Sequence, residues 1–156
     1  VESYNSKTLG RIGITDKFVQ DNESLSLKIG TLRGLHFQVP NVAQAKLISC
    51  TQGAIYDVVV DLRGGSTTFG QWYGINLNPE NGLHLYIPIG FAHGFITLKA
   101  KTKVYYKCSN YYSPKHERSL YWNDPTLNIK WPYTSEPIVS NKDQSGSLFS
   151  EFKSPF

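Results

Sequence analysis

The sequence predicts an all-β protein, an antiparallel sandwich or jelly-roll barrel, and three observations lead to that class. From residue 46 onward, short runs rich in β-branched and aromatic residues follow one another at fairly regular spacing. Glycine, proline and asparagine separate these runs, as tight turns require. No long segment repeats its apolar residues with a helical period, although residues 5–10 could form one helical turn. We therefore expect a barrel whose mouth is a usual place for a ligand.

The elements can be assigned in order along the chain. Residues 32–38, Leu-Arg-Gly-Leu-His-Phe-Gln, should alternate between two faces, which places His36 opposite Arg33 unless Gly34 bends the run. Further strands are expected over residues 46–51, 54–62, 70–77, 83–87, 95–98 and 103–108. After Tyr112 the chain becomes polar and rich in proline, so residues 113–156 should wrap the barrel as loops and short helical turns rather than as another sheet. A loosely held tail is expected from Gln144.

Length and composition narrow the class of protein. The 156 residues fit a single domain, residues 1–156, and 18% charged and 13% aromatic residues are typical of a folded globular chain. The net charge of +4 comes from scattered lysines and arginines, which suits a phosphorylated small ligand and gives no nucleic-acid stripe. No stretch is apolar enough to span a membrane, and the first residues do not resemble a signal peptide. We expect a soluble cytoplasmic protein that binds neither nucleic acid nor membrane.

The two cysteines agree with that compartment. Cys50 and Cys108 lie in apolar, strand-like runs and have no second cysteine or histidine at a zinc-like spacing. They are interpreted as buried free thiols of a reducing environment, although the sequence also permits a disulfide between them.

Residues 82–93, just past the middle of the chain, contain a pattern of glycine, proline and histidine. Gly82, Pro88, Gly90 and His93 resemble the second conserved motif of the cupin superfamily, in which a tight turn returns a histidine to the barrel interior. A metal-dependent cupin would need two earlier histidines and a carboxylate, but the earlier region offers only His36. We therefore expect no metal and no other cofactor, with His93 as a hydrogen-bonding or polarising group.

A more specific resemblance runs through almost the whole chain in order. The segments that carry it are residues 32–38, 44–47, 56–63, 66–70, 87–95, 106–107, 110–112, 122–125 and 140–143. Together they resemble the dTDP-4-dehydrorhamnose 3,5-epimerase family. That resemblance implies a metal-free jelly-roll homodimer that acts on a nucleotide-linked 4-keto-6-deoxy sugar in deoxysugar biosynthesis such as that of rhamnose.

The resemblance also assigns four catalytic residues. His36 would remove the proton next to the sugar ketone with Asp143 as its carboxylate partner, and an imidazole oriented in this way is a reasonable base. Tyr106 would return a proton from the opposite face, and Lys46 would hold positive charge near the developing enolate. From the residues alone, each has a plainer interpretation: a core histidine, a helix cap, a core aromatic and a rim lysine.

Nine further residues are implied to bind the substrate. Arg33 suits a diphosphate because guanidinium offers paired donors, and Tyr111 offers a flat surface on which the base could stack. The full substrate-binding set comprises Glu2, Gln20, Asp21, Asn22, Arg33, His93, Tyr111, Glu117 and Lys142. Turn and surface roles are the plainer interpretation of these residues.

One departure from the family concerns the N-terminus. The family begins with strands and an Asp-x-Arg-Gly-x-Phe-x-Glu motif whose arginine helps to grip the diphosphate, and only Glu2 matches the end of that motif here. The expectation is that this segment lies outside these 156 residues or is lacking. If it were lacking, affinity and dimer assembly would both be affected, because in the family this segment reaches the partner subunit.

The predicted function is epimerisation of dTDP-4-dehydro-6-deoxyglucose to dTDP-4-dehydrorhamnose at carbons 3 and 5 through an enolate. The sequence leaves three alternatives open. They are a 3-epimerase that acts at one carbon, a metal-dependent cupin, and a silent barrel that binds nucleotide sugars without catalysis.

Overall fold

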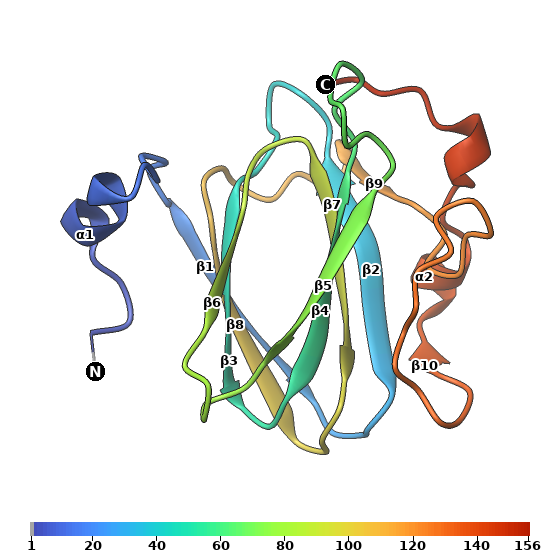
Figure 1. The fold of residues 1–156 in the computed structure, drawn as a ribbon, viewed down its shortest axis with the longest axis horizontal. Helices are drawn as coiled ribbons and strands as arrows, with labels where there is room; N and C mark the ends of the chain where they lie inside the picture. The colour runs from blue at the N-terminus through green and yellow to red at the C-terminus, as the bar shows by residue number, and fades with distance from the viewer. Residues whose placement is uncertain (1) are drawn as a thin grey trace.

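Two sheets face each other in the computed structural model, which describes residues 2–156 (Figure 1). The first sheet has the order β1-β8-β3-β6, from β1 (Gln20–Ser26), β8 (Thr102–Cys108), β3 (Lys46–Gln52) and β6 (His84–Ile87). The second has the order β10-β2-β7-β4-β5, from β10 (Ile138–Val139), β2 (Thr31–Gln38), β7 (Phe91–Thr97), β4 (Ile55–Asp61) and β5 (Trp72–Leu77), with β9 (Glu117–Ser119) paired to β2. All pairs except β10 with β2 are antiparallel. The predicted all-β jelly-roll class is confirmed.

The second sheet is buried on both faces. On β4, Val58 and Val60 belong to an apolar cluster with Leu127, Ile129 and Trp131 of the C-terminal third, while the alternate residues face the first sheet. Burial on both sides explains why the β4 sequence is a nearly continuous apolar run instead of an alternating one. A second cluster, which includes Ile48, Ile87 and Phe95, fills one end of the space between the sheets.

The C-terminal residues are packed, contrary to the expected loose tail. Phe149, Phe152 and Phe156 pack against the apolar cluster that covers β2, and Figure 1 shows this orange-to-red segment running along the outside of that strand. It includes helix α2 (Asn141–Gln144) and a 3-10 turn (Phe149–Glu151). The short strands β9 and β10 also correct the prediction of a C-terminal part without strands, because each adds only two or three residues and so leaves no alternating pattern.

The N-terminal part contains two further elements. Helix α1 (Ser6–Arg11) is capped by Asn5, whose side-chain oxygen accepts from the backbone N–H of Lys7 at 2.9 Å and of Thr8 at 3.2 Å. The predicted helical turn is confirmed. Strand β1 was missed because its sequence, Gln-Asp-Asn-Glu-Ser-Leu-Ser, holds almost no strand-forming residues. Pairing with the whole of β8 stabilises it instead.

Within residues 2–156, no helix combines the length and apolar character needed to cross a membrane.

Candidate active site

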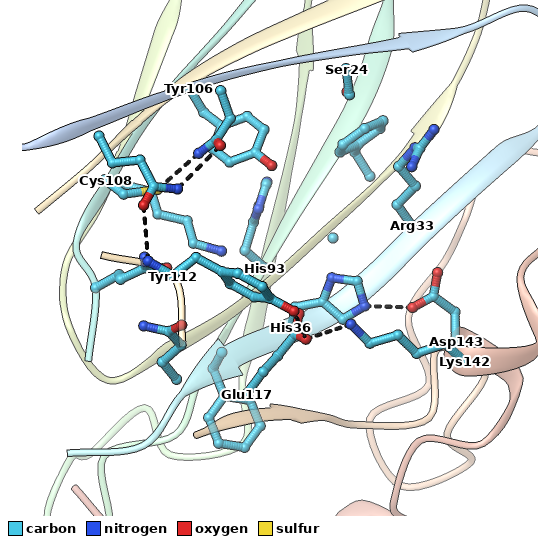
Figure 2. A pocket seen from close by; sticks show the side chains of 18 of the residues that line it. Ser24, Arg33, His36, His93, Tyr106, Cys108, Tyr112, Glu117, Lys142 and Asp143 are labelled. Atoms are coloured by element: carbon cyan, nitrogen blue, oxygen red, sulfur yellow. Dashed lines mark hydrogen bonds and ion pairs between the residues drawn. The ribbon is translucent and has the colours of Figure 1, made fainter. Parts of the chain in front are cut away.

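A cavity of about 450 Å³ lies between the two sheets (Figure 2). Strands β1, β3 and β8 form one wall, β2 and β7 form the facing wall, and β9, α2 and the segment after β8 complete it. The cavity is lined by Gln20, Asn22, Ser24, Arg33, His36, Phe37, Gln38, Gln44, Lys46, His93, Gly94, Phe95, Tyr106, Cys108, Tyr112, Glu117, Ser140, Lys142 and Asp143. Ten of the thirteen residues predicted for the site are in this set.

A β-bulge in β2 brings Arg33 and His36 to the same wall. Arg33 pairs with Phe95 and His36 pairs with His93, so β2 advances three residues while β7 advances two. The extra residue exchanges the two faces of the strand around Gly34, which is the exception to alternation that the sequence left open. Both polar side chains therefore line the cavity, whereas Leu32 and Leu35, at 1% and 0% exposure, join the apolar cluster behind it.

Two glycines allow this bulge to pack against β7. Gly34 has φ +120°, and a Cβ built on it would lie 2.5 Å from Gly94 Cα. A Cβ on Gly94 would lie 2.7 Å from the carbonyl oxygen of Arg33. The backbones are therefore closer than side chains at either position would permit.

The imidazole of His36 is bonded to the buried carboxylate of Asp143. The distance from His36 Nε2 to Asp143 Oδ1 is 2.5 Å, and the two residues are 107 positions apart in the chain. Burial by itself would raise the pKa of Asp143, but the hydrogen bond and charge of His36 and the hydrogen bond from Ser140 outweigh it, so the pKa is lowered. An ionised carboxylate only accepts hydrogen bonds, so Nε2 carries a proton, and in the neutral form of this imidazole the lone pair is on Nδ1. Asp143 thus gives His36 the tautomer that a base at Nδ1 requires.

Tyr106 approaches the cavity from the opposite wall. It lies on β8 of the first sheet, whereas His36 lies on β2 of the second, and Figure 2 shows both side chains directed into the same cavity. Burial raises the pKa of Tyr106, so its phenol keeps its proton at neutral pH. Its neighbour Tyr105 faces outward beside Asp21, as alternation along the strand predicts.

Lys46, the first residue of β3, places its ammonium group in the same cavity. Burial lowers the pKa of Lys46, and the negative potentials of Cys108, Glu117 and Asp57 oppose this only in part. Tightly enclosed positive charge of this kind can stabilise an oxyanion that forms on a bound ligand.

A second histidine and carboxylate pair involves His93, which lines the cavity, and Asp57, which does not. His93 Nε2 is 2.5 Å from Oδ1 of Asp57, and Asp57 is completely buried on β4. Asp57 was not predicted as a site residue, although a lone aspartate inside the apolar run of β4 is a signal that could have identified it. Within residues 2–156, no cluster of three or more histidine, cysteine, aspartate or glutamate side chains is arranged to hold a metal ion.

One side of the cavity is bordered by three linked polar side chains. Lys142 Nζ donates to Glu117 Oε2 at 2.5 Å, and the hydroxyl of Tyr112 donates to the same oxygen at 2.8 Å (Figure 2). Burial alone would raise the pKa of Glu117, but the bonds from Lys142 and Tyr112 lower it below its ordinary value. Glu117 is therefore ionised at neutral pH.

The polar residues of β1 line the cavity at alternate positions. Gln20, Asn22 and Ser24 are half-buried and face inward, whereas Asp21 and Glu23 are exposed on the other face. Asn22 and Gln20 were predicted; Ser24 was missed, and it could have been found from the same alternation once β1 was recognised as a strand.

Three of the predicted binding residues lie outside this cavity. Asp21 faces away from it and pairs with Lys107 at 2.9 Å. Tyr111 is 66% exposed, and its neighbour Tyr112 lines the cavity in its place. Glu2 lines a separate hollow of about 380 Å³ between the α1 segment and β6. Residues 110–112 follow the end of β8, so strand alternation does not set which of the two tyrosines faces the cavity.

Taken together, the cavity holds an oriented imidazole on one wall, a protonated phenol on the other and an enclosed ammonium group. Such a set can remove a proton beside a carbonyl, stabilise the resulting enolate and supply a proton from the opposite side.

Comparison with known proteins leads to the same chemistry. A sequence model of the family described as dTDP-4-dehydrorhamnose 3,5-epimerase matches residues 1–151. The dTDP-4-dehydrorhamnose 3,5-epimerase of Salmonella typhimurium is 50% identical over 151 residues, which is 96% of this chain and 82% of that protein.

Solved structures of such enzymes share the fold. The crystal structure of the Bacillus anthracis enzyme, with TDP and PPi bound, superposes with a TM-score of 0.92 at 54% identity, covering 94% of this chain and 83% of that one. The Legionella pneumophila enzyme, in complex with dTDP-4-keto-L-rhamnose, gives a TM-score of 0.93 at 46% identity, covering 97% and 80%. A 3'-monoepimerase from Streptomyces bikiniensis, in complex with dTDP-quinovose, is less similar, with a TM-score of 0.87 at 34% identity, covering 96% and 75%. By sequence and by structure, this chain belongs to the dTDP-4-dehydrorhamnose 3,5-epimerase family.

Proposed function

We propose that this protein is an isomerase that converts dTDP-4-dehydro-6-deoxyglucose to dTDP-4-dehydrorhamnose by inverting carbons 3 and 5. The observation that carries the proposal is the placement of His36, with its Asp143 partner, and Tyr106 on facing walls of one cavity. A single residue could remove and return a proton on one face only, so inversion needs groups on both faces.

The proposed reaction uses the ketone at carbon 4. His36 Nδ1 takes the proton from carbon 3 or carbon 5, and the electron pair of the broken C–H bond passes into the ketone to form an enolate. Lys46 stabilises the negative charge on that oxygen, an effect worth several kcal/mol in an enclosed site. Tyr106 then protonates the carbon from the opposite face, and the enolate reverts to the ketone. To reset the pair, His36 releases its proton to solvent and the phenolate of Tyr106 takes a proton from solvent.

The remaining cavity residues are proposed to bind the nucleotide and the diphosphate. Arg33 makes only long contacts of 3.4 and 3.5 Å with Ser26 Oγ, which leaves its guanidinium donors free for phosphate oxygens. Lys142 adds a second cation beside the cavity. Tyr112 offers the aromatic face for the base that Tyr111, in its exposed position, does not offer to this cavity.

The organisation of the protein is also proposed. We treat residues 1–156 as one domain because the two sheets jointly enclose the cavity and its apolar neighbours. Homodimerisation and a cytoplasmic location follow from the family resemblance, and the buried free thiols of Cys50 and Cys108 support a reducing compartment.

The test is turnover of dTDP-4-keto-6-deoxyglucose in deuterated water, measured both without and with a chelator. Deuterium at both carbon 3 and carbon 5, read by NMR of the sugar, is the expected result. Label at one carbon would assign the protein to the mono-epimerases, and absence of label would identify a silent binder. Loss of exchange on adding chelator would instead identify a metal-dependent cupin.

The same assay tests the proposed base. His36→Ala should abolish deuterium exchange while the affinity for dTDP stays within about twofold, because the imidazole acts on the sugar and not on the nucleotide. The matched control is His84→Ala, which removes an exposed histidine far from this cavity's wall. Equal exchange in His36→Ala and His84→Ala would remove His36 from its role.

A further inference from the structure

The residue that begins helix α2 is tied to the carboxylate that orients His36. Ser140 is the N-cap of α2, and Asp143 is the third residue of that helix. The hydroxyl of Ser140 accepts from the backbone N–H of Asp143 at 3.1 Å and donates to Asp143 Oδ2 at 2.9 Å. One hydroxyl thus uses both its donor and its acceptor capacity on a single residue.

This arrangement departs from the common capping box. In that box, the side chain of the third helical residue reaches back to the backbone N–H of the N-cap. The Asp143 carboxylate instead accepts from Ser140 at Oδ2 and from His36 at Oδ1. Both oxygens are therefore held, and rotation of the carboxylate would break bonds on two sides.

Ser140 is in turn fixed to the strand that carries the base. Strand β10 ends at Val139, which pairs with Leu32 of β2, so Ser140 follows directly from that pairing. The chain of contacts runs from β2 through β10 and Ser140 to Asp143, and returns to β2 at His36. Figure 2 shows Asp143 reaching His36 from the α2 side of the cavity.

We propose that Ser140 is a positioning residue of the reaction, which acts through Asp143 to keep His36 protonated at Nε2 and free to act as a base at Nδ1. This inference rests on the proposed function. Without the hydroxyl, Oδ2 of Asp143 loses its donor, the carboxylate turns more freely, and His36 spends less time in the competent tautomer and orientation.

The test compares three variants at a temperature well below the onset of unfolding. Ser140→Ala should lower kcat by about 10- to 100-fold with KM and the affinity for dTDP unchanged, since geometry at the base is lost and nucleotide contacts are kept. Ser140→Thr keeps the hydroxyl and should restore most of kcat. Ser145→Ala is the matched control, because its hydroxyl donates to the Lys142 carbonyl at 2.9 Å at the other end of the same helix.

Two readouts separate positioning from a purely structural role. In an Asp143→Asn background, Ser140→Ala should cause no further loss of kcat, because the two residues act as a unit. The ¹⁵N shifts of His36 should report mainly the Nε2–H tautomer in the wild type and a mixture in Ser140→Ala.

Three results would overturn the inference. They are a kcat for Ser140→Ala equal to that of Ser145→Ala, a full additional loss in the Asp143→Asn background, or unchanged ¹⁵N shifts. A raised KM or weakened dTDP binding would mean that Ser140 contacts the ligand directly, which also contradicts it. Failure of the proposed function would be seen separately, because the wild-type protein would then show no deuterium exchange. The ¹⁵N shifts of His36 could still be measured in that case.

Discussion

At the scale of single residues, the cavity shifts proton affinities in opposite directions. Burial lowers the pKa of Lys46 and raises the pKa of Tyr106, because removal from water disfavours the charged form of each group. The favoured neutral forms are the amine of Lys46 and the phenol of Tyr106. Lys46 is therefore the group whose charge is lost first as pH rises, and Tyr106 remains an acid beyond that point.

This order predicts the alkaline limb of the rate. Turnover should fall as Lys46 loses its proton, at a pH below the usual lysine pKa of about 10.4. Lys46→Arg should move the alkaline limb of kcat upward, because arginine stays charged, even if the bulkier group lowers the maximum rate. The measurement is kcat between pH 7 and 11, with Lys99→Arg as an exposed control. A different result would assign the alkaline limb to the phenol of Tyr106. In that case the limb would stay in place in Lys46→Arg and would be absent from the pH profile of the deuterium exchange that remains in Tyr106→Phe.

At the scale of elements, one bulge decides which side chains reach the substrate. The three-against-two register between β2 and β7 turns Arg33 and His36 toward the cavity together. Strict alternation would have sent one of them into the apolar cluster behind the sheet.

Replacing the glycine at the bulge should therefore harm stability and activity together. Gly34→Ala introduces a side chain at φ +120° and a contact of 2.5 Å with Gly94 Cα, which we expect to cost about 2 kcal/mol of unfolding free energy or more. Urea denaturation gives this value, and kcat reports the displacement of His36. Gly65→Ala is the control, since it has nothing within 4 Å of the added Cβ. Equal stability of the two variants would show that the bulge relaxes without strain.

At the scale of the whole molecule, the C-terminal third holds the second sheet from outside and joins it to the loop after β4. Ser154 Oγ donates to the Leu62 carbonyl at 2.5 Å, and the backbone N–H of Gly64 donates to the Phe156 carbonyl at 3.3 Å. The loop itself is organised by Asp61, whose carboxylate accepts from Arg63, Ser66 and Thr68 and is 2% exposed.

Acid stability should depend on that carboxylate. Hydrogen bonds from Arg63 outweigh burial and lower the pKa of Asp61, so its contribution is complete above the unfolded pKa of about 3.9 and is lost as pH falls toward the folded value. Asp61→Asn should cost about 2 kcal/mol at pH 7, a figure that allows for screening of the half-exposed Arg63.

The measurement is the urea midpoint at pH 7 and pH 3. The gap between wild type and Asp61→Asn should narrow at pH 3, because the wild type has lost there part of a stabilisation that the variant lacks. The exposed loop variant Glu136→Gln serves as control. A gap that is constant between the two pH values would contradict the assignment.

Much of this architecture could be predicted from local pattern. Strands β3, β4, β5, β6 and β8 were expected close to their observed bounds, because apolar and β-branched runs between turn residues reflect burial directly. Strand β1 and the packed C-terminal phenylalanines were not, because their stability comes from partners far away in the chain.

The sequence by itself determined most of the strands, the acid–base character of the candidate site residues and, through resemblance, the family. Only the tertiary structure decided that Arg33 and His36 share a wall, that Tyr112 and not Tyr111 lines the cavity, and that Ser140 holds Asp143. The reason is physical: alternation and turn preference depend on neighbours in the chain, whereas a bulge, a cavity wall or a hydrogen bond across 107 positions depends on the strand that packs alongside.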